Sequence, residues 1–305
     1  MTHDIRLGVD LGGTKIEVVA LDATGQVRWK RRCATPRDDY VGILATVADM
    51  VREAEAAAGV PHGSASVGIG MPGSISRATG LLRGSNSVCL NGQPVARDLA
   101  AALQRPVRIT NDANCFALSE AIDGAGAGSD VVFGVILGTG VGAGIVVGGR
   151  VLEGRNAIAG EWGHNPLPWP RDDERPGTSC FCGRAGCIET WLSGPALARD
   201  HAQRHGGTAT AEAIVAAAAG GDLAAAATLA RYEERLARAL AHVINLLDPD
   251  VIVLGGGLSN IDRLYANVLA QWGSWVFSDR VDTRLARNVH GDSSGVRGAA
   301  WLWNT

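Results

Sequence analysis

The sequence has no excess of basic residues. It holds 28 Lys and Arg against 31 Asp and Glu in 305 residues, which gives a formal net charge of -3 at pH 7. Proteins that bind nucleic acid normally gather Lys and Arg on one face or along one stripe, whereas here both are spread evenly along the chain. We therefore expect no nucleic-acid partner, and a small-molecule ligand is the better default.

Long apolar runs are missing as well. No stretch of eighteen apolar residues occurs, and the chain does not open with a basic segment followed by an apolar one. The first absence argues against a membrane-spanning helix and the second against a secretory signal. We expect a cytoplasmic protein with no membrane partner. Its length and its 46% hydrophobic content suit a globular protein of two domains.

Cysteine and histidine are scarce, with six and seven residues, yet four of them gather in one segment. Cys180, Cys182 and Cys187 fall within eight residues, and His164 lies just upstream. A structural zinc ion takes four nitrogen or sulfur ligands in a closed tetrahedron. The alternatives are three free thiols on a loop or a disulfide with one thiol left over. Because a cytosolic chain keeps such thiols reduced, the clustering favours zinc.

Two glycine-rich turns each join a pair of apolar strands. Strands are expected at residues 5–11 and 16–21 around the first turn, and at 131–137 and 145–147 around the second, which covers 138–144. Glycine permits positive φ and lets backbone N–H groups approach phosphate oxygens. Neither turn has the residue order of a P-loop. Two similar hairpins nevertheless predict two similar lobes, and together the turns favour nucleotide binding.

Two further features lie near strand ends. Asp10 comes directly before the first turn, where its carboxylate would suit Mg²⁺; the alternative is a turn-capping carboxylate. A helix expected over residues 222–247 leads through a strand at 251–254 to the glycines 255–257. Those glycines could admit a base or ribose, or they could simply let a helix pack closely. The sequence leaves these two interpretations even.

Asp112 follows a strand that begins at Val107 and opens a helix expected to run to about Ile122. Open α/β sheets place their ligands at such strand-to-helix switches. By position alone, an ordinary N-cap is the better interpretation, since Asp is among the preferred N-cap residues. The phosphate-type turns and the possible Mg²⁺ ligand elsewhere in the chain favour a catalytic role for Asp112. Transfer of a phosphoryl group to a hydroxyl needs an aligned carboxylate to take the proton.

Five motifs in this order and spacing resemble those of the ROK (repressor, open reading frame, kinase) family over nearly all of the chain. They are Asp10-Leu-Gly-Gly-Thr-Lys15, Asn111-Asp112-Ala-Asn114, Gly138-Thr-Gly-Val-Gly-Ala-Gly144, Gly160-Glu-Trp-Gly-His164 and Cys180-Phe-Cys-Gly-Arg-Ala-Gly-Cys187-Ile-Glu189. The resemblance implies an actin-like, hexokinase-like α/β fold of two lobes, each a duplicated ribonuclease H-like unit. It implies an N-terminal lobe at residues 1–120, joined by a C-terminal helix at about 291–305. A C-terminal lobe at 121–290 would carry the zinc segment.

The resemblance also implies roles for particular residues, with Asp112 as the catalytic base and ATP, Mg²⁺ and a structural zinc ion as cofactors. Nucleotide-binding residues would be Asp10, Gly12, Gly13, Thr14, Lys15, Gly138, Thr139, Gly140, Gly142, Gly144, Gly255, Gly256 and Gly257. Sugar-binding residues would be Gly73, Asn86, Asn111, Glu161, His164 and Glu189. The zinc ligands would be His164, Cys180, Cys182 and Cys187.

The implied activity is ATP-dependent phosphorylation of a hexose at its 6-hydroxyl. Segments 35–40, 91–94, 160–169 and 290–303 resemble the family members that act on fructose and mannose, which makes fructose the leading acceptor. N-acetylglucosamine and glucose are the alternatives. A sugar-sensing repressor is disfavoured, because only about ten residues precede the first turn, too few for a DNA-binding domain. The resemblance makes a homodimer the expected assembly.

Two local features of the sequence carry smaller expectations. The second turn has Ala143 where the family often has glycine, and we expect the methyl group to be tolerated if the backbone keeps a negative φ. Segment 169–178 is rich in Pro, Asp and Arg, and we expect it to be a mobile excursion near the sugar entrance or a partner subunit.

Overall fold

The chain passes back and forth between two units in the computed structural model, which describes residues 5–303. The first unit comprises Met1–Gly128, Gly144–Ala159 and Val289–Thr305, and the second comprises Ser129–Ala143 and Gly160–Asn288. Segment Gly144–Ala159 thus groups with the N-terminal part, which differs from the division expected at residue 120. The last two residues of the expected C-terminal helix, 304 and 305, lie outside the described residues.

The sheet of the first unit has five strands in the order β3-β2-β1-β4-β7. The strands are β1 (Arg6–Leu11), β2 (Lys15–Leu21), β3 (Val27–Ala34), β4 (Ser66–Met71) and β7 (Val107–Asn111). β2 pairs antiparallel with β1 and β3, whereas β4 pairs parallel with β1 and β7. A small separate hairpin pairs β5 (Ser74–Ile75) with β6 (Leu82–Arg83).

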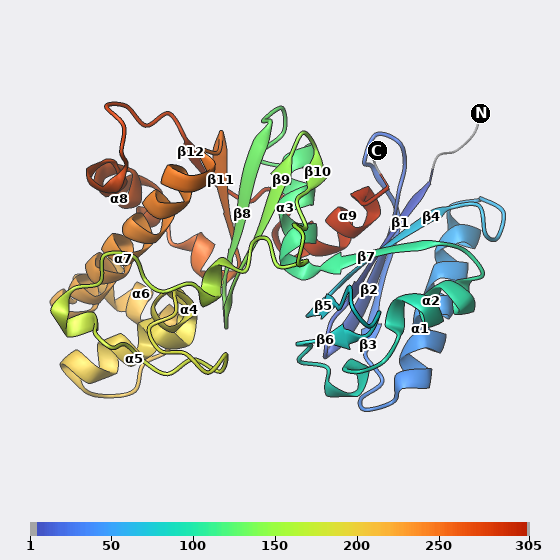
Figure 1. Ribbon diagram of the computed structural model, residues 1–305, viewed down its shortest axis with the longest axis horizontal. Helices are drawn as coiled ribbons and strands as arrows, with labels where there is room; N and C mark the ends of the chain where they lie inside the picture. The colour runs from blue at the N-terminus through green and yellow to red at the C-terminus, as the bar shows by residue number, and fades with distance from the viewer. Residues whose placement is uncertain (1–4, 304–305) are drawn as a thin grey trace. The chain divides into compact units, whose positions relative to one another are not determined.

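Two pairs of helices contact this sheet. The helices are α1 (Tyr40–Ala57), α2 (Val95–Leu103), α3 (Asp112–Asp123) and α9 (Ser294–Trp301). α1 and α2 contact each other and the sheet, and α3 and α9 form a second such pair, so β1, β2 and β4 are buried on both faces (Figure 1). Strands covered on both sides read as nearly continuous apolar runs, as these do.

Glycines let the C-terminal helix α9 lie directly on this sheet. A Cβ atom added to Gly8 of β1 would overlap the carbonyl oxygen of Val296, and one added to Gly68 of β4 would overlap that of Ala299. On the other side of the helix, a Cβ at Gly298 would overlap the carbonyl of Cys115 in α3. The last helix of the chain is therefore packed backbone against backbone between β1, β4 and α3 (Figure 1).

A second five-stranded sheet has the order β10-β9-β8-β11-β12. The strands are β8 (Val131–Leu137), β9 (Val141–Val147), β10 (Arg150–Val151), β11 (Val251–Gly255) and β12 (Arg284–Arg287), and β11 pairs parallel with both β8 and β12. The helices are α4 (Glu189–Leu192), α5 (Gly194–His205), α6 (Ala211–Ala219), α7 (Leu223–Leu247) and α8 (Arg263–Trp272). Among the described helices, none alone is long and apolar enough to cross a membrane, although α6 and α7 pass that test as a pair bent by 115°.

Most expected elements are confirmed, but the second glycine turn is shorter than expected. β9 begins at Val141, so the turn spans Gly138–Gly140, and Gly142 and Gly144 lie inside the strand. Gly144 has a packing reason to be glycine, because an added Cβ would lie 2.6 Å from the carbonyl oxygen of Ala113. Ala143 is buried and keeps a negative φ, as expected.

The expectation that segment 169–178 is mobile is wrong. Its central residue, Glu174, is only 4% exposed and forms ion pairs with Arg235 at 2.7 Å and with Arg238 at 2.8 Å. The ring of Trp169 at its start stacks on Trp275, with centroids 5.4 Å apart. The buried ion pairs of Glu174 with Arg235 and Arg238 therefore hold this segment against α7.

Candidate functional site

Two carboxylates stand at one edge of the first unit's sheet. Asp10 lies near the end of β1, and Asp112 follows the end of β7; both strands run parallel to β4, which lies between them. Burial, together with the negative charges of Asp112 and Glu17, raises the pKa of Asp10 to about 6. Burial also raises the pKa of Asp112. Two partly buried carboxylates that repel each other suit a divalent cation, and oxygen ligands are those that Mg²⁺ prefers.

Neither carboxylate has the structural role that the sequence left open: Asp112 is not a helix N-cap, and Asp10 does not cap a turn. The N-cap of α3 is Asn111, whose Oδ1 accepts a hydrogen bond from the backbone N–H of Asn114 at 2.7 Å, so the N-cap interpretation of Asp112 is wrong by one residue. Asp112 Oδ1 instead accepts from the neighbouring N–H of Ala113, at 2.9 Å. Within residues 5–303 no hydrogen bond to the Asp10 carboxylate is found, so it does not cap the first turn.

A cross-strand row of charges, which sequence reasoning missed, continues from Asp10. Glu17 of β2 is paired in register with Asp10, and Arg32 of β3 is paired with Glu17. Glu17 is 1% exposed and binds Arg32 Nε at 2.5 Å and Lys30 Nζ at 2.7 Å. The signal was available, because a Glu at an inward position of a buried strand needs a cationic partner. The row places two cations, Lys30 and Arg32, on β3, which is separated from the strand of Asp10 by β2.

The first glycine turn is fixed by hydrogen bonds within the turn and to Thr35. Gly12 N–H donates to the carbonyl of Lys15 at 3.0 Å, and Thr35 Oγ1 donates to the carbonyl of Gly12 at 2.7 Å. A Cβ added to Gly13 would lie 3.5 Å from Asn86 Oδ1. The structure thus brings Asn86, predicted as a sugar ligand, next to the turn predicted to hold phosphate.

A small cavity of about 170 Å³ opens beside Gly73 and Asn111, two of the predicted sugar ligands. Its other lining residues are Met71, Ser74, Ile75, Arg77, Leu82, Ile109, Thr110, Asn114, Glu153 and Ala157. Gly73 has φ of +89°, and an added Cβ would lie 2.5 Å from the carbonyl oxygen of Arg83, so this position requires glycine. Arg77 and Glu153 form an ion pair at 3.1 Å in the cavity wall.

In the second unit, the turn Gly138–Gly140 is bonded to two other segments. Gly194 N–H donates to the carbonyl of Gly138 at 2.8 Å, and the backbone N–H of Val141 donates to Glu189 Oε2 at 2.9 Å. Glu189, predicted to hold a sugar hydroxyl, therefore lies against the turn predicted to hold phosphate.

The glycines at 255–257 were expected either to admit a base or ribose or to allow close packing, and the structure gives a different answer for Gly256 than for Gly257. A Cβ added to Gly256, which has φ of +77°, would overlap the backbone of Leu137, so close packing explains that glycine. Nothing lies within 4 Å of a Cβ added to Gly257, which leaves open space at that position.

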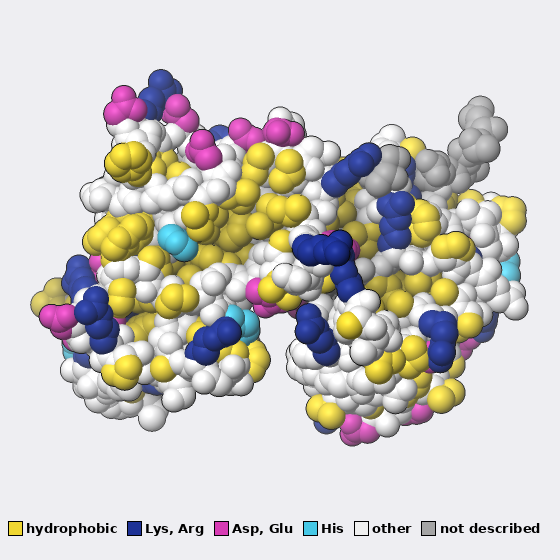
Figure 2. Space-filling model, in the orientation of Figure 1, with side chains coloured by type: hydrophobic (Ala, Val, Ile, Leu, Met, Phe, Trp, Pro, Cys, Tyr) yellow, Lys and Arg dark blue, Asp and Glu magenta, His cyan; other side chains and the backbone are white. Residues whose placement is uncertain are grey.

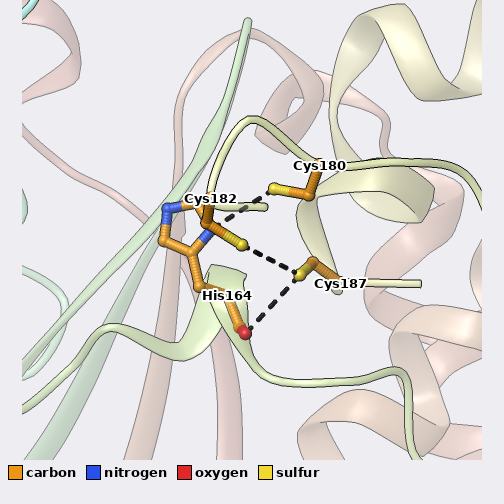
Figure 3. A group of neighbouring side chains, drawn as sticks. All are labelled: His164, Cys180, Cys182 and Cys187. Atoms are coloured by element: carbon orange, nitrogen blue, oxygen red, sulfur yellow. Dashed lines mark hydrogen bonds between the residues drawn. The ribbon is translucent and has the colours of Figure 1, made fainter. Parts of the chain in front are cut away.

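The predicted zinc ligands converge on one point (Figure 3). Cys180 Sγ lies 3.6 Å from His164 Nδ1, Cys182 Sγ lies 3.6 Å from Cys187 Sγ, and all four ligand atoms lie within 4.8 Å of one another. In a tetrahedral zinc site with Zn–S bonds of about 2.3 Å, two sulfurs stand about 3.8 Å apart and a sulfur and a nitrogen about 3.6 Å apart. The four residues fit a zinc ion without rearrangement of the chain.

Around that cluster, His164 Nδ1 faces the sulfurs, which leaves Nε2 as the second ring nitrogen. The ring of Phe181 packs edge-on against the His164 ring, with centroids 4.9 Å apart. Glu161, two residues before Gly163, is exposed, and no hydrogen bond to its carboxylate occurs in the described part of the chain. The predicted acceptor ligands therefore fall into two sets: Gly73, Asn86 and Asn111 belong to the first unit, and Glu161, His164 and Glu189 to the second.

Comparisons with known proteins show the family of the chain. The sequence profile of the ROK family matches residues 6–305. An N-acetyl-D-glucosamine kinase from Pectobacterium atrosepticum is 42% identical over 299 residues, which cover 97% of each chain. The crystal structure of a ROK hexokinase from Thermus thermophilus superposes with a TM-score of 0.87 at 30% identity, covering 98% of this chain and 97% of that one.

A further solved relative carries ligands. The ROK family glucokinase from Streptomyces griseus, in complex with glucose and AMPPNP, superposes with a TM-score of 0.77 at 28% identity over 98% of both chains. The two-lobed, hexokinase-like α/β fold is thereby confirmed. The chain therefore belongs to the ROK family, and it is an ATP-dependent sugar kinase.

Proposed function

We propose that the protein phosphorylates N-acetyl-D-glucosamine at its 6-hydroxyl with ATP. The observation that carries this proposal is the 42% identity, over 97% of both chains, to a kinase named for that sugar. A second such kinase, from Yersinia pseudotuberculosis, is 40% identical over the same share of this chain. Sequence reasoning placed fructose first and N-acetylglucosamine second, and these relatives support the reverse order.

The cavity beside Gly73 and Asn111 supports the same acceptor. An acetamido group ends in a methyl group, which gains from burial against apolar side chains, and Ile75, Leu82 and Ile109 line this cavity. Its amide can bond to polar groups of the lining, which include Ser74 and Thr110. Fructose, mannose and glucose have no group that would fill such a space, so they would leave it empty or wet.

In the proposed mechanism, Asp112 is the base. The 6-hydroxyl oxygen forms a bond to the γ-phosphorus, the bond from that phosphorus to the leaving oxygen of ADP breaks, and the hydroxyl proton moves to the Asp112 carboxylate. The raised pKa of Asp112 makes this carboxylate a better proton acceptor than an exposed one. Because phosphoryl transfer has a loose transition state, alignment and electrostatics supply most of the rate.

Asp10 is the residue proposed to hold Mg²⁺, directly or through water, and the ion when bound would neutralise phosphate charge. The turns Gly12–Lys15 and Gly138–Gly140 would present backbone N–H groups to the phosphates. In the zinc segment, Nδ1 of His164 would bind the metal and Nε2 would donate to a sugar hydroxyl, so that zinc fixes the tautomer of the ring. All four zinc positions are then filled by protein, which gives the ion a structural role.

The expected homodimer remains part of the proposal, as does a cytoplasmic location. Figure 2 shows apolar side chains gathered on one face of the second unit, and large exposed apolar side chains of this unit include Leu246 at 76%, Phe277 at 99% and Trp169 at 46% exposure. Contiguous apolar surface of this kind is typical of protein interfaces. Sedimentation equilibrium with Leu246→Glu would test it: a dimer in the wild type and a monomer in the variant are expected.

The position of the new bond tests the proposed reaction. Incubation with ATP, Mg²⁺ and an equimolar mixture of N-acetylglucosamine and fructose, followed by phosphorus–proton correlation NMR, should show the 6-phosphate of N-acetylglucosamine as the main product. A main product phosphorylated at the anomeric carbon would contradict the proposed chemistry. Fructose 6-phosphate as the main product would contradict the proposed acceptor.

A further inference from the structure

A second, larger cavity of about 370 Å³ lies wholly within the second unit and has no part in the proposed reaction. One wall is the segment Arg175–Thr178, another is formed by Thr190 and Trp191, and a third comes from α5. Its volume falls within the range of about 300–1,000 Å³ that is typical of small-molecule sites. A ligand could therefore be accommodated there.

The lining of this cavity is positively charged, although the whole chain is negative. Four arginines (Arg175, Arg199, Arg204 and Arg235) line it against two aspartates (Asp173 and Asp200), which leaves an excess of two positive charges. Arg204 and Arg235 are already neutralised: Arg204 pairs with Asp173 at 2.6 Å, and Arg235 pairs with Glu174 at 2.7 Å. Arg175 lies 3.7 Å from Asp172, which leaves Arg199 as the lining arginine with no carboxylate partner among the described residues.

Arg199 is the unusual member of the set. It is partly buried, yet no carboxylate of the described residues lies within ion-pair distance of it, and its guanidinium donates only to the backbone carbonyl of Thr190. Burial lowers the pKa of Arg199, and the charge of Arg235 adds to this, although the negative charge of Asp200 opposes it. Trp191 lines the same cavity, and its buried indole N–H has no hydrogen-bond partner in the region described. Arg199 is thus a partly buried cation that no carboxylate of the described residues pairs with.

An anion in the cavity would supply what is missing. A guanidinium presents several N–H donors in a planar fork that matches the oxygens of phosphate, and such charge-assisted pairs are among the stronger hydrogen bonds. Arginines outnumber aspartates in the lining, which favours an anion over a cation as the occupant. We propose that this cavity binds a phosphate dianion, either free or as the phosphoryl group of a phosphorylated metabolite, with Arg199 as its principal ligand.

Occupancy of the cavity would act on the zinc segment, because the two share a wall. The N–H of Gly186 donates to the carbonyl of Thr178 at 3.0 Å, and Thr190 Oγ1 donates to the carbonyl of Cys187 at 2.7 Å. A phosphate held between residues 175–178 and Thr190 would therefore restrain the segment that carries Cys187 and Glu189. This inference does not depend on which sugar is the acceptor.

Calorimetric titration of inorganic phosphate into the full-length, zinc-loaded protein tests the proposal. The active site is first filled with a non-hydrolysable ATP analogue and the acceptor sugar, so that phosphate can report only on a second site. We expect saturable binding to the wild type and at least tenfold weaker binding to Arg199→Gln. Arg280→Gln, which changes an arginine that is 78% exposed, should bind like the wild type. Absence of saturable binding to the wild type, or equal binding to Arg199→Gln, would overturn the proposal.

A second variant and a second ligand complete the test. If Arg199→Gln melts at a lower temperature than the wild type, Arg175→Gln replaces it, because Arg175 is 62% exposed and lies 3.7 Å from its partner Asp172. Weaker phosphate binding is again expected. Titration with a hexose 6-phosphate distinguishes the two sources: binding at least tenfold tighter than that of inorganic phosphate identifies a phosphorylated metabolite, and equal binding identifies free phosphate.

Discussion

Glu189 Oε2 accepts a hydrogen bond from the backbone N–H of Val141 at 2.9 Å. A carboxylate of the zinc segment thus accepts from the backbone N–H that directly follows the second glycine turn. A Cβ added to Gly140 would lie 2.6 Å from the same oxygen, so the turn must be glycine for Glu189 to reach it. Glu189 therefore links the proposed sugar side of the second unit to its proposed phosphate side.

This link predicts unequal effects of Glu189→Gln on the two substrates. The amide oxygen of glutamine can still accept from Val141, but the negative charge beside the phosphate turn is gone. We expect the KM for the sugar to rise by about ten- to a hundredfold, because a hydrogen bond to a charged group contributes about 1.5–3 kcal/mol. The KM for ATP should stay the same or fall. Steady-state kinetics in both substrates checks this, and a KM for ATP that rises more than that for the sugar would place Glu189 on the nucleotide side.

Asp112→Asn should reduce kcat by at least about a hundredfold, the lower range for loss of a general base. Asn111 is the N-cap of α3, so the substitution removes no cap and the variant should melt near the wild-type temperature. Binding of the sugar and the nucleotide, measured by calorimetry, should be nearly unchanged. A folded variant that keeps near-wild-type turnover would show that another group takes the proton.

The raised pKa of Asp10 predicts a stability effect of known sign. Its pKa is about 6 in the folded protein against an ordinary 3.8, so above pH 6 the ionised carboxylate costs stability in the folded state. A shift of about two units corresponds to about 3 kcal/mol as an upper limit. We therefore expect Asp10→Asn to be more stable than the Mg²⁺-free wild type at pH 7.5.

The pH dependence provides the control for that prediction. As pH falls from 6 towards 4, the folded wild type takes up a proton that the unfolded chain does not, so the wild type should gain stability relative to Asp10→Asn until the two coincide near pH 4. Thermal denaturation without Mg²⁺ between pH 4 and 8 measures both effects. The same variant should lose most ATP turnover. Lower stability of Asp10→Asn at pH 7.5 would contradict the environment described for this carboxylate.

Removal of zinc should weaken stability and sugar binding together. The metal would hold His164 through Nδ1, so a chelated protein should show a lower melting temperature and a higher KM for the sugar, with a smaller change in the KM for ATP. Cys182→Ser should behave in the same way, and metal analysis should find one zinc ion per wild-type chain. A zinc-free protein that binds the sugar with unchanged affinity would separate the metal from the acceptor site.

The glycine contacts of α9 predict a severe effect of a single methyl group. Gly298→Ala would force the new Cβ into the carbonyl of Cys115, so either the helix or α3 must move, and overpacking typically costs about 1–3 kcal/mol or more. Gly273→Ala is the matched control, because nothing lies within 4 Å of its added Cβ. Denaturant unfolding should show a large loss for the first variant and almost none for the second.

Local patterns explain what could be predicted from the sequence. The first hairpin, the long helix α7 and the Cys3His cluster are encoded by residues close together in the chain, and all were expected. Two of the errors have a common cause, since each depends on partners that are distant in sequence. Glu174 is buried because Arg235 and Arg238 lie 61 and 64 residues away, and no local signal reveals that. Gly144 is a strand residue that packs on Ala113 rather than a turn residue.

The N-cap of α3 was misplaced for a different reason. Asn111 and Asp112 are adjacent, and both residue types cap helices well, so a one-residue choice decides whether Asp112 is structural or free. Only the bond from Asn114 N–H to Asn111 Oδ1 settles that choice. The cavity beside Gly73 was likewise beyond local sequence patterns, because it is built from strands β5, β6 and β7 together.

The most direct test of the central claim is a comparison of kcat/KM for N-acetylglucosamine, fructose, mannose and glucose, measured with saturating ATP and Mg²⁺. We predict the highest value for N-acetylglucosamine, by at least about tenfold, because only that sugar fills the apolar cavity and one buried group of this size contributes about 1–3 kcal/mol to discrimination. A higher kcat/KM for fructose than for N-acetylglucosamine would contradict the account.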